Sequence, residues 1–232
     1  MAKEIVKKII QLGGVDLKRY DKAIDQYSSM YRKYKTFTMV PKELFISNLS
    51  LASKFLNVKG DLVECGVWRG GMIASISELA GSTKKAHLFD SFEGLPPVQE
   101  IDGKEAINWQ KDTSSATYYE NCTADESFAI NAMNKTGHSN YRLYKGWFKD
   151  TLASYDGAEI SILRLDGDWY DSIKICLEKL FPLVANGGLI ILDDYHTWDG
   201  CTKAVHDYLS EIKSPSRICQ WSNQVAYIVK KN

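Results

Sequence analysis

The sequence predicts an α/β domain with a mostly parallel sheet that ends in an antiparallel hairpin. Short apolar runs alternate with helix-like segments from about residue 60 almost to the C-terminus, and the last two apolar runs are joined by a short polar turn. Such alternation is typical of parallel strands connected by crossover helices. Two strands with so short a link must pair antiparallel. We therefore expect seven strands with helices packed against them.

The expected elements follow one another in a regular order. Strands are predicted at residues 61–66, 86–90, 141–144, at the runs ending at Asp166 and Asp193, and at 217–221 and 225–229. Helices are predicted at about 70–79, around 118–133, at 172–184 and at 201–212. Residues 98–113 are polar without a clear period, which indicates a long mobile loop. A closing hairpin is unusual for a dinucleotide-binding Rossmann domain and usual for a class I methyltransferase sheet.

The first 58 residues are expected to form a helical extension or lid, and residues 59–232 the main domain. Apolar positions at helical spacing predict helices packed outside the sheet, namely Ile5, Ile9 and Ile10, and then Leu44, Leu49, Leu51 and Phe55. Between them, residues 27–34 are aromatic and basic, as expected of a lid or a subunit contact. The sequence thus allows a homo-oligomer paired through its N-terminal helices.

The composition indicates a small-molecule partner. Lys plus Arg number 29 and Asp plus Glu number 29, so no net basic field attracts nucleic acid or an anionic membrane. No apolar run approaches the roughly 20 residues of a membrane span, and the first residues lack the apolar core of a secretory signal. We therefore expect a cytoplasmic protein. The five cysteines are scattered singly, which indicates neither a disulfide framework nor a zinc site, and Cys65 and Cys176 are expected in the core.

A glycine-containing turn follows the first strand. Residues 64–71 are ECGVWRGG and lead into a helix whose N-terminus presents free N–H groups. The turn lacks the G-x-G-x-x-G spacing of a pyrophosphate site, and any tight strand-to-helix turn also needs glycine. Asp90 ends the second strand, where an acid accepts hydrogen bonds from a ribose diol. Together these features predict a pocket for a nucleoside without a pyrophosphate.

Aspartates gather at the ends of two later strands. Asp166 and Asp168 follow one apolar run, and Asp193 and Asp194 follow the next. Ligands of open α/β sheets bind beyond these strand ends, and like charges so close repel unless a cation or proton lies between them. Aspartates also cap helices. Three acids at adjacent strand ends nevertheless favour a hard cation, Mg²⁺, Mn²⁺ or Ca²⁺ rather than zinc, held by Asp166, Asp193 and Asp194.

Two residues compete as the general base. Asp168 is close to the expected metal yet free to accept a proton, whereas His196 follows a strand end and carries an imidazole, a group that often serves as a general base. We favour Asp168, because a lone His is more often a surface residue. His87 is expected in the core, and Trp147 either covers an adenine ring or belongs to the core.

Six short motifs occur in a fixed order. They are TMV at 38–40, GVWRGG at 66–71, DSFEGLP at 90–96, GWFKDTL at 146–152, LDGDWY at 165–170 and DDY at 193–195. In this order the motifs resemble the macrocin O-methyltransferase family of S-adenosylmethionine-dependent sugar O-methyltransferases. Residues 98–113 and the segment before Met39 match no pattern that would identify the acceptor.

The resemblance implies magnesium-dependent methylation of a sugar hydroxyl, on a glycosylated natural product or on a nucleotide-linked or polysaccharide sugar. It implies the same metal ligands, with Asp168 as the base. His196 lies in YHTW, which departs from the family and makes it a candidate for a catalytic role specific to this chain. The residues expected to contact S-adenosylmethionine are Glu64, Gly66, Trp68, Arg69, Gly70, Gly71, Asp90, Ser91, Gly146, Trp147 and Asp166.

Three other functions stay open at this point. A metal-dependent O-methyltransferase acting on a catechol-like diol needs the same ion and the same two oxygens. A nicotinamide oxidoreductase is disfavoured by the missing pyrophosphate fingerprint and by the hairpin. A non-catalytic carbohydrate-binding protein on a methyltransferase scaffold is disfavoured because a degenerate site has no reason to keep mutually repelling carboxylates.

Overall fold

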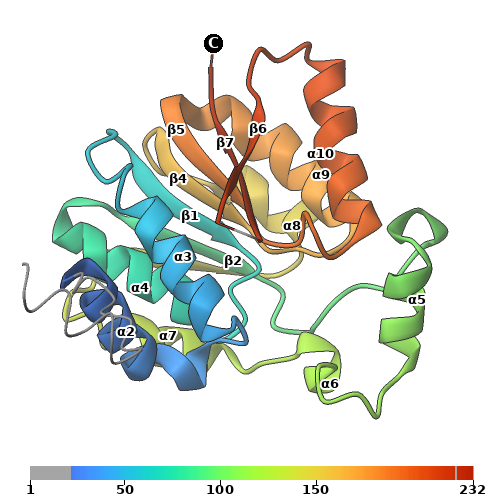
Figure 1. The fold of residues 1–232 in the computed structure, drawn as a ribbon, viewed down its shortest axis with the longest axis horizontal. Coiled ribbons are helices and arrows are strands. Elements are labelled where there is room, and N and C mark those ends of the chain that lie inside the picture. The colour runs from blue at the N-terminus through green and yellow to red at the C-terminus, as the bar shows by residue number, and fades with distance from the viewer. Residues whose placement is uncertain (1–21, 223, 232) are drawn as a thin grey trace, which may run out of the picture.

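The computed structural model describes residues 22–222 and 224–231, whose strands form a single seven-stranded sheet (Figure 1). The strands are β1 (Asp61–Cys65), β2 (Ala86–Asp90), β3 (Tyr141–Lys145), β4 (Ile160–Leu165), β5 (Val184–Leu192), β6 (Ile218–Trp221) and β7 (Val225–Val229). Their order across the sheet is β3-β2-β1-β4-β5-β7-β6. β1 to β5 run parallel, and β7 pairs antiparallel with both β5 and β6. The predicted fold class and hairpin are confirmed.

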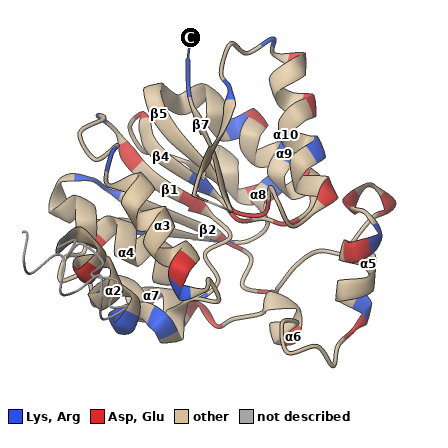
Figure 2. Ribbon diagram, viewed as in Figure 1, with Lys and Arg blue, Asp and Glu red and all other residues tan. Residues whose placement is uncertain are grey.

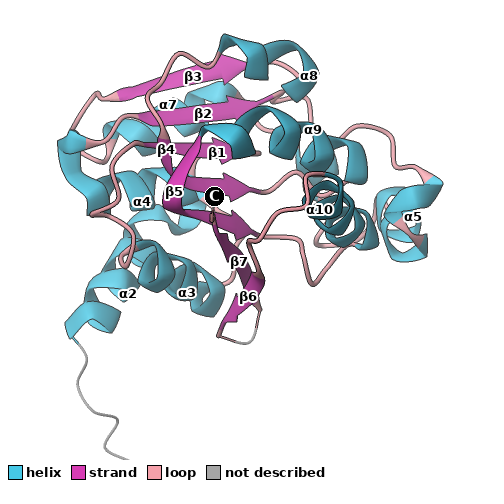
Figure 3. Cartoon of the chain, turned by 90° about the horizontal axis from the view of Figure 1, so that it is seen from above, coloured by secondary structure: helices cyan, strands magenta, loops and turns pink. Residues whose placement is uncertain are grey.

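Helices cover both faces of the sheet (Figure 3). The α-helices are α2 (Lys22–Tyr34), α3 (Lys42–Ala52), α4 (Gly71–Ala80), α5 (Lys104–Lys111), α6 (Tyr119–Cys122), α7 (Glu126–Asn134), α8 (Phe148–Thr151), α9 (Tyr170–Leu180) and α10 (Asp199–Glu211). Short 3₁₀ turns are η1 (Lys35–Phe37), η2 (Gly81–Thr83), η3 (Glu100–Asp102), η4 (Leu152–Ser154) and η5 (Phe181–Leu183). Residues of α2, α3, α4 and α7 share one hydrophobic core, and residues of α9 and α10 share the other.

Alternate side chains of the central strands belong to the two hydrophobic cores on opposite faces of the sheet. In β5, Leu189 and Ile191 point to the first core, whereas Ile190 and Leu192 point to the second. All four side chains are 0% exposed. Successive strand residues face opposite sides, so a strand buried on both sides appears as a continuous apolar run. This explains why the apolar runs alone located the parallel strands.

The described part of the N-terminal extension, α2 and α3, is packed into the first core. Tyr27 and Tyr34 of α2 are 7% and 0% exposed, and the Tyr34 hydroxyl donates to Glu78 of α4 at 2.5 Å. Tyr27 and Tyr34 are therefore core residues, and the partly buried Tyr31 packs against the same core, while the expected role of the extension as a lid or subunit contact stays a prediction. The helix expected around Ile5 and Ile9 lies outside the described residues, and the division at residues 58 and 59 stays a prediction.

The expectation of a mobile loop at residues 98–113 is wrong, because this segment contains η3 and α5. The Asp102 carboxylate accepts hydrogen bonds from Gln99 N at 2.8 Å and from Tyr170 N at 2.7 Å, which ties the segment to the start of α9. Ala106 is the buried residue of α5. A helix with so little apolar surface has no apolar period to detect.

The helix expected around residues 118–133 is interrupted. Residues 119–122 form α6, a left-handed turn with φ values of 47°, 53°, 57° and 61°. α7 begins only after Asp125, whose side chain accepts a hydrogen bond from Ser127 N at 2.9 Å. A left-handed residue with a Cβ costs roughly 1–2 kcal/mol. Asn121 offsets part of this cost by hydrogen bonds in both directions with the Leu95 backbone, at 2.8 and 3.0 Å.

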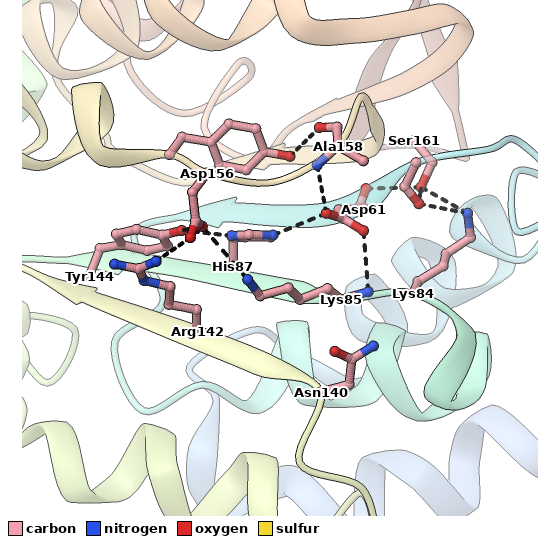
Figure 4. Close-up of polar contacts among 12 residues, drawn as sticks. Asp61, Lys84, Lys85, His87, Asn140, Arg142, Tyr144, Asp156, Ala158 and Ser161 are labelled. Atoms are coloured by element: carbon pink, nitrogen blue, oxygen red, sulfur yellow. Dashed lines mark hydrogen bonds and ion pairs between the residues drawn. The ribbon is translucent and has the colours of Figure 1, made fainter.

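His87 lies in the core, as predicted, within a polar network (Figure 4). Its Nδ1 is 2.9 Å from the Tyr144 hydroxyl and its Nε2 is 3.2 Å from Asp61 Oδ2. Tyr144 in turn donates to Asp156 at 2.7 Å. Burial lowers the pKa of His87, although Asp61 acts in the opposite direction. Cys65 is likewise buried, as predicted.

The surface carries charges of both signs. Basic and acidic residues are mixed over the helices in the view of Figure 2. Among the described residues, no helix combines the length and the apolar character that crossing a membrane requires.

Candidate active site

A cavity of about 580 Å³ lies at the carboxyl ends of β1, β4 and β5. From the centre of the sheet, the chain goes from β1 outward to β2 and β3, and from β4 outward to β5. Such a switch between neighbouring strands is where open α/β sheets bind ligands. The loops that follow these strands supply much of the lining, and residues 37–41 and 117–122 supply another part.

Gly66 allows the two central strand ends to approach each other. Its φ is +85°, and a Cβ at this position would lie 1.7 Å from the carbonyl oxygen of Asp166. Any side chain here would therefore separate β1 from β4 at the floor of the cavity. This glycine is required by the close approach of two backbones.

Two acids line the side of the cavity that follows β1 and β2. Asp90 accepts hydrogen bonds from Trp68 N at 2.8 Å and from Phe92 N at 2.7 Å. Glu64 is 1% exposed, and its Oε2 has no hydrogen-bond partner among the described residues. Burial raises the pKa of Glu64 to about 7, even though Arg164 lowers it. A buried acceptor without a partner favours a positively charged donor in the cavity.

Three aspartates converge on the opposite side. One oxygen from each of Asp166, Asp168 and Asp194 lies within 4.8 Å of the others. Burial raises the pKa of Asp166 to about 6, and burial together with the charge of Asp166 raises that of Asp168 to about 8. Burial and the neighbouring acids also raise the pKa of Asp194 well above its usual range. Carboxylates so arranged are stabilised by a cation or by protons.

Arg164 on β4 joins this cluster to Glu64. Its guanidinium is 1% exposed and forms ion pairs with Glu64, with Asp166 at 2.6 Å and with Asp193 at 2.5 Å. Asp193 thus pairs with an arginine and does not belong to the group of three convergent oxygens. The buried cation compensates part of the negative charge that the strand ends bring together.

Residues 23–229 match the family described as "Macrocin-O-methyltransferase (TylF)". The chain belongs to the macrocin O-methyltransferase family. The motifs identified it correctly, and the sheet of this family member is that of class I methyltransferases.

Curated relatives carry related names. The chain is 35% identical over 159 residues to the "8-demethyl-8-(2,3-dimethoxy-alpha-L-rhamnosyl)-tetracenomycin-C 4'-O-methyltransferase" of Streptomyces olivaceus, covering 65% of this chain and 58% of that protein. It is 36% identical to the "Demethyldecarbamoylnovobiocin O-methyltransferase" of Streptomyces niveus, covering 66% and 59%. The "Mycinamicin III 3''-O-methyltransferase" of Micromonospora griseorubida is 28% identical, covering 73% and 68%. The chain thus spans about three fifths of the length of the first two.

Solved structures agree with this family membership. The O-methyltransferase NovP superposes with a TM-score of 0.69 at 29% identity, covering 84% of this chain and 83% of NovP. The calicheamicin methyltransferase CalS11 has a TM-score of 0.63 at 18% identity, covering 91% and 94%, which shows a shared fold.

Most of the predicted site residues of this methyltransferase-family chain face the cavity. Those in its lining are Glu64, Gly66, Trp68, Asp90, Ser91, Trp147, Asp166, Asp168, Asp193 and Asp194. Their functional roles stay predictions.

Five predicted residues are not part of the cavity lining: Arg69, Gly70, Gly71, Gly146 and His196. Arg69 stacks between the rings of Trp68 and Phe128, 4.3 and 4.5 Å from their centroids. A Cβ on Gly70 would lie 2.8 Å from Ala129 Cα, and one on Gly71 would lie 2.5 Å from the Phe37 carbonyl oxygen. These two glycines allow close packing of α7 and η1. The backbone N–H of Gly146 donates to the Asp90 carbonyl at 2.9 Å, and His196 is exposed.

Several lining residues were not anticipated from the sequence. They are Phe37, Pro41, Leu44, Leu95, Trp109, Thr117, Tyr119, Cys122, Arg164 and Trp198. Trp109 is the aromatic residue of the mainly polar helix α5, and this was the signal available for it. Leu95, Arg164 and Trp198 lie close in the sequence to predicted site acids, whereas the remaining residues lie in segments distant along the chain.

Proposed function

We propose that this chain transfers a methyl group from S-adenosylmethionine to a sugar hydroxyl in a reaction assisted by Mg²⁺ or Mn²⁺. One observation carries the proposal: a single cavity joins Glu64 and Asp90 to the convergent carboxylates of Asp166, Asp168 and Asp194. Membership in the macrocin O-methyltransferase family supports the same reaction.

The side of the cavity near Glu64 suits the methyl donor. The unpartnered Glu64 Oε2 would accept hydrogen bonds from the donor's ammonium group. Asp90 accepts two backbone N–H groups and, with about four lone-pair sites on a carboxylate, keeps capacity for ribose hydroxyls. S-adenosylmethionine supplies an electrophilic methyl group on a positively charged sulfur. The surrounding carboxylates favour that charge.

The side near β4 and β5 suits a hard divalent cation. Mg²⁺ is commonly bound by one or two carboxylates together with water and substrate oxygens, and we assign Asp166 and Asp194 to that task. Asp193, the third ligand predicted from the sequence, pairs with Arg164 through Oδ1 and lies outside the convergent group, so we do not assign it to the cation. The cation would lower the pKa of an acceptor hydroxyl.

Asp168 is the residue we assign to remove the acceptor proton. Its Oδ1 accepts a hydrogen bond from Trp198 Nε1 at 2.8 Å, which leaves Oδ2 to receive the proton. His196 is exposed and outside the cavity lining, so we assign it no part in this step. The walls of the cavity contribute by holding the acceptor oxygen in line with the methyl group.

The charge of the cavity favours an uncharged glycoside over a nucleotide-linked sugar. Its described lining contains six carboxylates and one basic side chain, Arg164, which already pairs with three of them. A diphosphate would meet repulsion from the carboxylates, and that lining offers it no basic side chain free of an ion pair. Two relatives are named for a rhamnosyl-tetracenomycin and for mycinamicin III, whereas CalS11 is described as a TDP-rhamnose 3'-O-methyltransferase.

Calorimetry and product analysis test the proposal together. Calorimetry with S-adenosylhomocysteine measures donor binding. Mass spectrometry of reactions with phenyl α-L-rhamnoside, dTDP-rhamnose or catechol, with Mg²⁺ or with EDTA, identifies the acceptor and the metal requirement. We expect methylation of the rhamnoside that EDTA abolishes. Asp166→Asn should lose this turnover while keeping S-adenosylhomocysteine affinity, and Glu159→Gln, an exposed acid before β4, should change neither.

Three results would contradict the proposal. Absence of S-adenosylhomocysteine binding would contradict methyl transfer altogether. Full activity in EDTA would contradict the role of the metal. Methylation of catechol without methylation of either sugar would move the function to aromatic diols.

A further inference from the structure

Three tryptophans form a compact group beside the acid cluster. Trp109 belongs to α5, Trp169 follows β4 and Trp198 follows β5. Their ring centroids are 6.1 Å apart for Trp109 and Trp169, 5.9 Å for Trp109 and Trp198, and 5.4 Å for Trp169 and Trp198, at interplanar angles of 71°, 60° and 66°. These are edge-to-face contacts, the geometry that aromatic pairs favour. We call the three residues the indole wall.

Hydrogen bonds fix every ring of the indole wall. Trp198 Nε1 donates to Asp168 Oδ1 at 2.8 Å, Trp169 Nε1 to the Pro96 carbonyl at 3.0 Å and Trp109 Nε1 to Thr117 Oγ1 at 3.3 Å. Each indole thus has its polar atom engaged and its ring faces left for apolar contact. One of these bonds ends on the carboxylate that we assign to proton removal.

The indole wall stands where an acceptor would approach the cluster. Trp109 and Trp198 both line the 580 Å³ cavity, and both also line a second cavity of about 280 Å³. The second cavity is otherwise lined by Glu105, Asn108, Asp112 and Ser115. The two indoles therefore lie between the acid cluster and an outer, polar space.

We infer that Trp109 and Trp198 form the acceptor subsite and that Trp198 is also a positioning residue for Asp168. This inference rests on the proposed function. A pyranose presents a face of C–H bonds, which packs on a flat indole, while its hydroxyls project from the ring edge toward the carboxylates. Binding sites commonly pair such aromatic surfaces with a few polar groups that fix orientation. The Trp198 N–H holds Asp168 Oδ1, so Oδ2 is directed to the acceptor.

Two variants separate these roles. Trp109→Ala removes an apolar surface and leaves Asp168 untouched, so we expect the KM for phenyl α-L-rhamnoside to rise about tenfold with a small change in kcat. Trp198→Phe keeps an aromatic ring but removes the N–H, so we expect kcat to fall about tenfold or more and KM to change less. The Kd of S-adenosylhomocysteine, measured by calorimetry, should stay within about twofold in both variants.

A binding measurement makes the test independent of turnover. Methyl α-L-rhamnopyranoside, added to the protein with S-adenosylhomocysteine and Mg²⁺, should change tryptophan fluorescence in the native protein and in Trp221→Phe. Trp221 is on β6 and outside both cavity linings, so this variant is the matched control. Trp109→Ala should weaken that sugar binding, and its circular dichroism spectrum should show that it folds.

The outcomes distinguish the indole wall from the proposed function. A native protein that binds the sugar through Trp109 without methylating it would support the wall and count against the function. An unchanged sugar affinity and KM in folded Trp109→Ala would overturn the acceptor subsite. A Trp198→Phe variant with native kcat would overturn the positioning role.

Discussion

Arg164→Met removes a buried positive charge that three carboxylates share. The guanidinium and its partner Glu64 are each 1% exposed, and Asp166 and Asp193 are 27% and 24% exposed. Removing one partner of a buried ion pair costs about 3–5 kcal/mol, because the other charge stays buried without compensation. For a domain of this size, that loss lowers Tm by roughly 6–20 °C.

The free energy of unfolding that Arg164→Met costs should increase with pH. Burial already raises the pKa of Glu64 to about 7 and that of Asp166 to about 6 while Arg164 is present. Without the arginine both pKa values rise further. Carboxyls with raised native pKa values stabilise the fold below their unfolded pKa, and this stability is lost as pH rises through the native pKa. The difference in the free energy of unfolding between the native protein and Arg164→Met should therefore increase from about pH 6 to about pH 8.

Urea unfolding followed by circular dichroism, in EDTA at about pH 6 and at about pH 8, measures this difference in the free energy of unfolding. Arg142→Met is the matched control, because Arg142 on β3 pairs with Asp156 where the side chains are 48% and 46% exposed (Figure 4). Its loss should be much smaller and nearly independent of pH. A loss for Arg164→Met no larger than that of Arg142→Met, or one that is the same at both pH values, would refute the reasoning.

Two further predictions concern the floor of the cavity and its acids. Gly66→Ala should lower Tm far more than Gly137→Ala, because a Cβ at position 66 would lie 1.7 Å from the Asp166 carbonyl oxygen. Gly137 has a similar φ of +83° but open space around it. Equal losses of Tm in the two variants would contradict this explanation. In EDTA, stability should fall as pH rises through the pKa values of about 6 to about 8 of Asp166, Glu64 and Asp168, and added Mg²⁺ should raise Tm more at about pH 8.5 than at about pH 5.5. An equal Mg²⁺ shift at both pH values would argue against binding by these ionised carboxylates.

The sheet could be predicted from the sequence, since each buried strand forms an apolar run bounded by turn residues. Burial on both faces makes Leu189–Leu192 continuously apolar, and the short link before Val225 forces the hairpin. α5 could not be found in this way, because Ala106 is its buried residue and polar contacts, such as those that Gln110 donates to the Pro96 carbonyl and to Asn121, hold it in place. The periodicity of apolar residues predicts which positions are buried, but it does not predict hydrogen bonds.

The left-handed turn at residues 119–122 also lacks a signal in the sequence. Tyr119, Glu120, Asn121 and Cys122 are four successive non-glycine residues with positive φ, a conformation that among these four is common only for Asn. Contacts with the Leu95 backbone hold it. Tertiary contacts therefore override the local preference of the chain.

The acids of the site were found because they follow strands directly, whereas their counter-charge was missed. Arg164 lies within an apolar strand pattern, and its partner Glu64 is 100 residues away in the sequence. Whether Asp193 faces a metal or an arginine depends on that pairing. The indole wall was missed for the same reason, because its members come from three separate connections.

The two sides of the cavity come from different kinds of segment. Glu64, Gly66 and Asp90 come from β1, β2 and the turns directly after them, whereas Trp109 comes from the long excursion between β2 and β3 that stands apart from the layers (Figure 1). This connection between β2 and β3 contains helices and contributes no strand to the sheet. Substitutions within residues 98–125 therefore alter one wall of the cavity, which includes Trp109, Thr117 and Tyr119, and leave in place the strand ends that carry the acids.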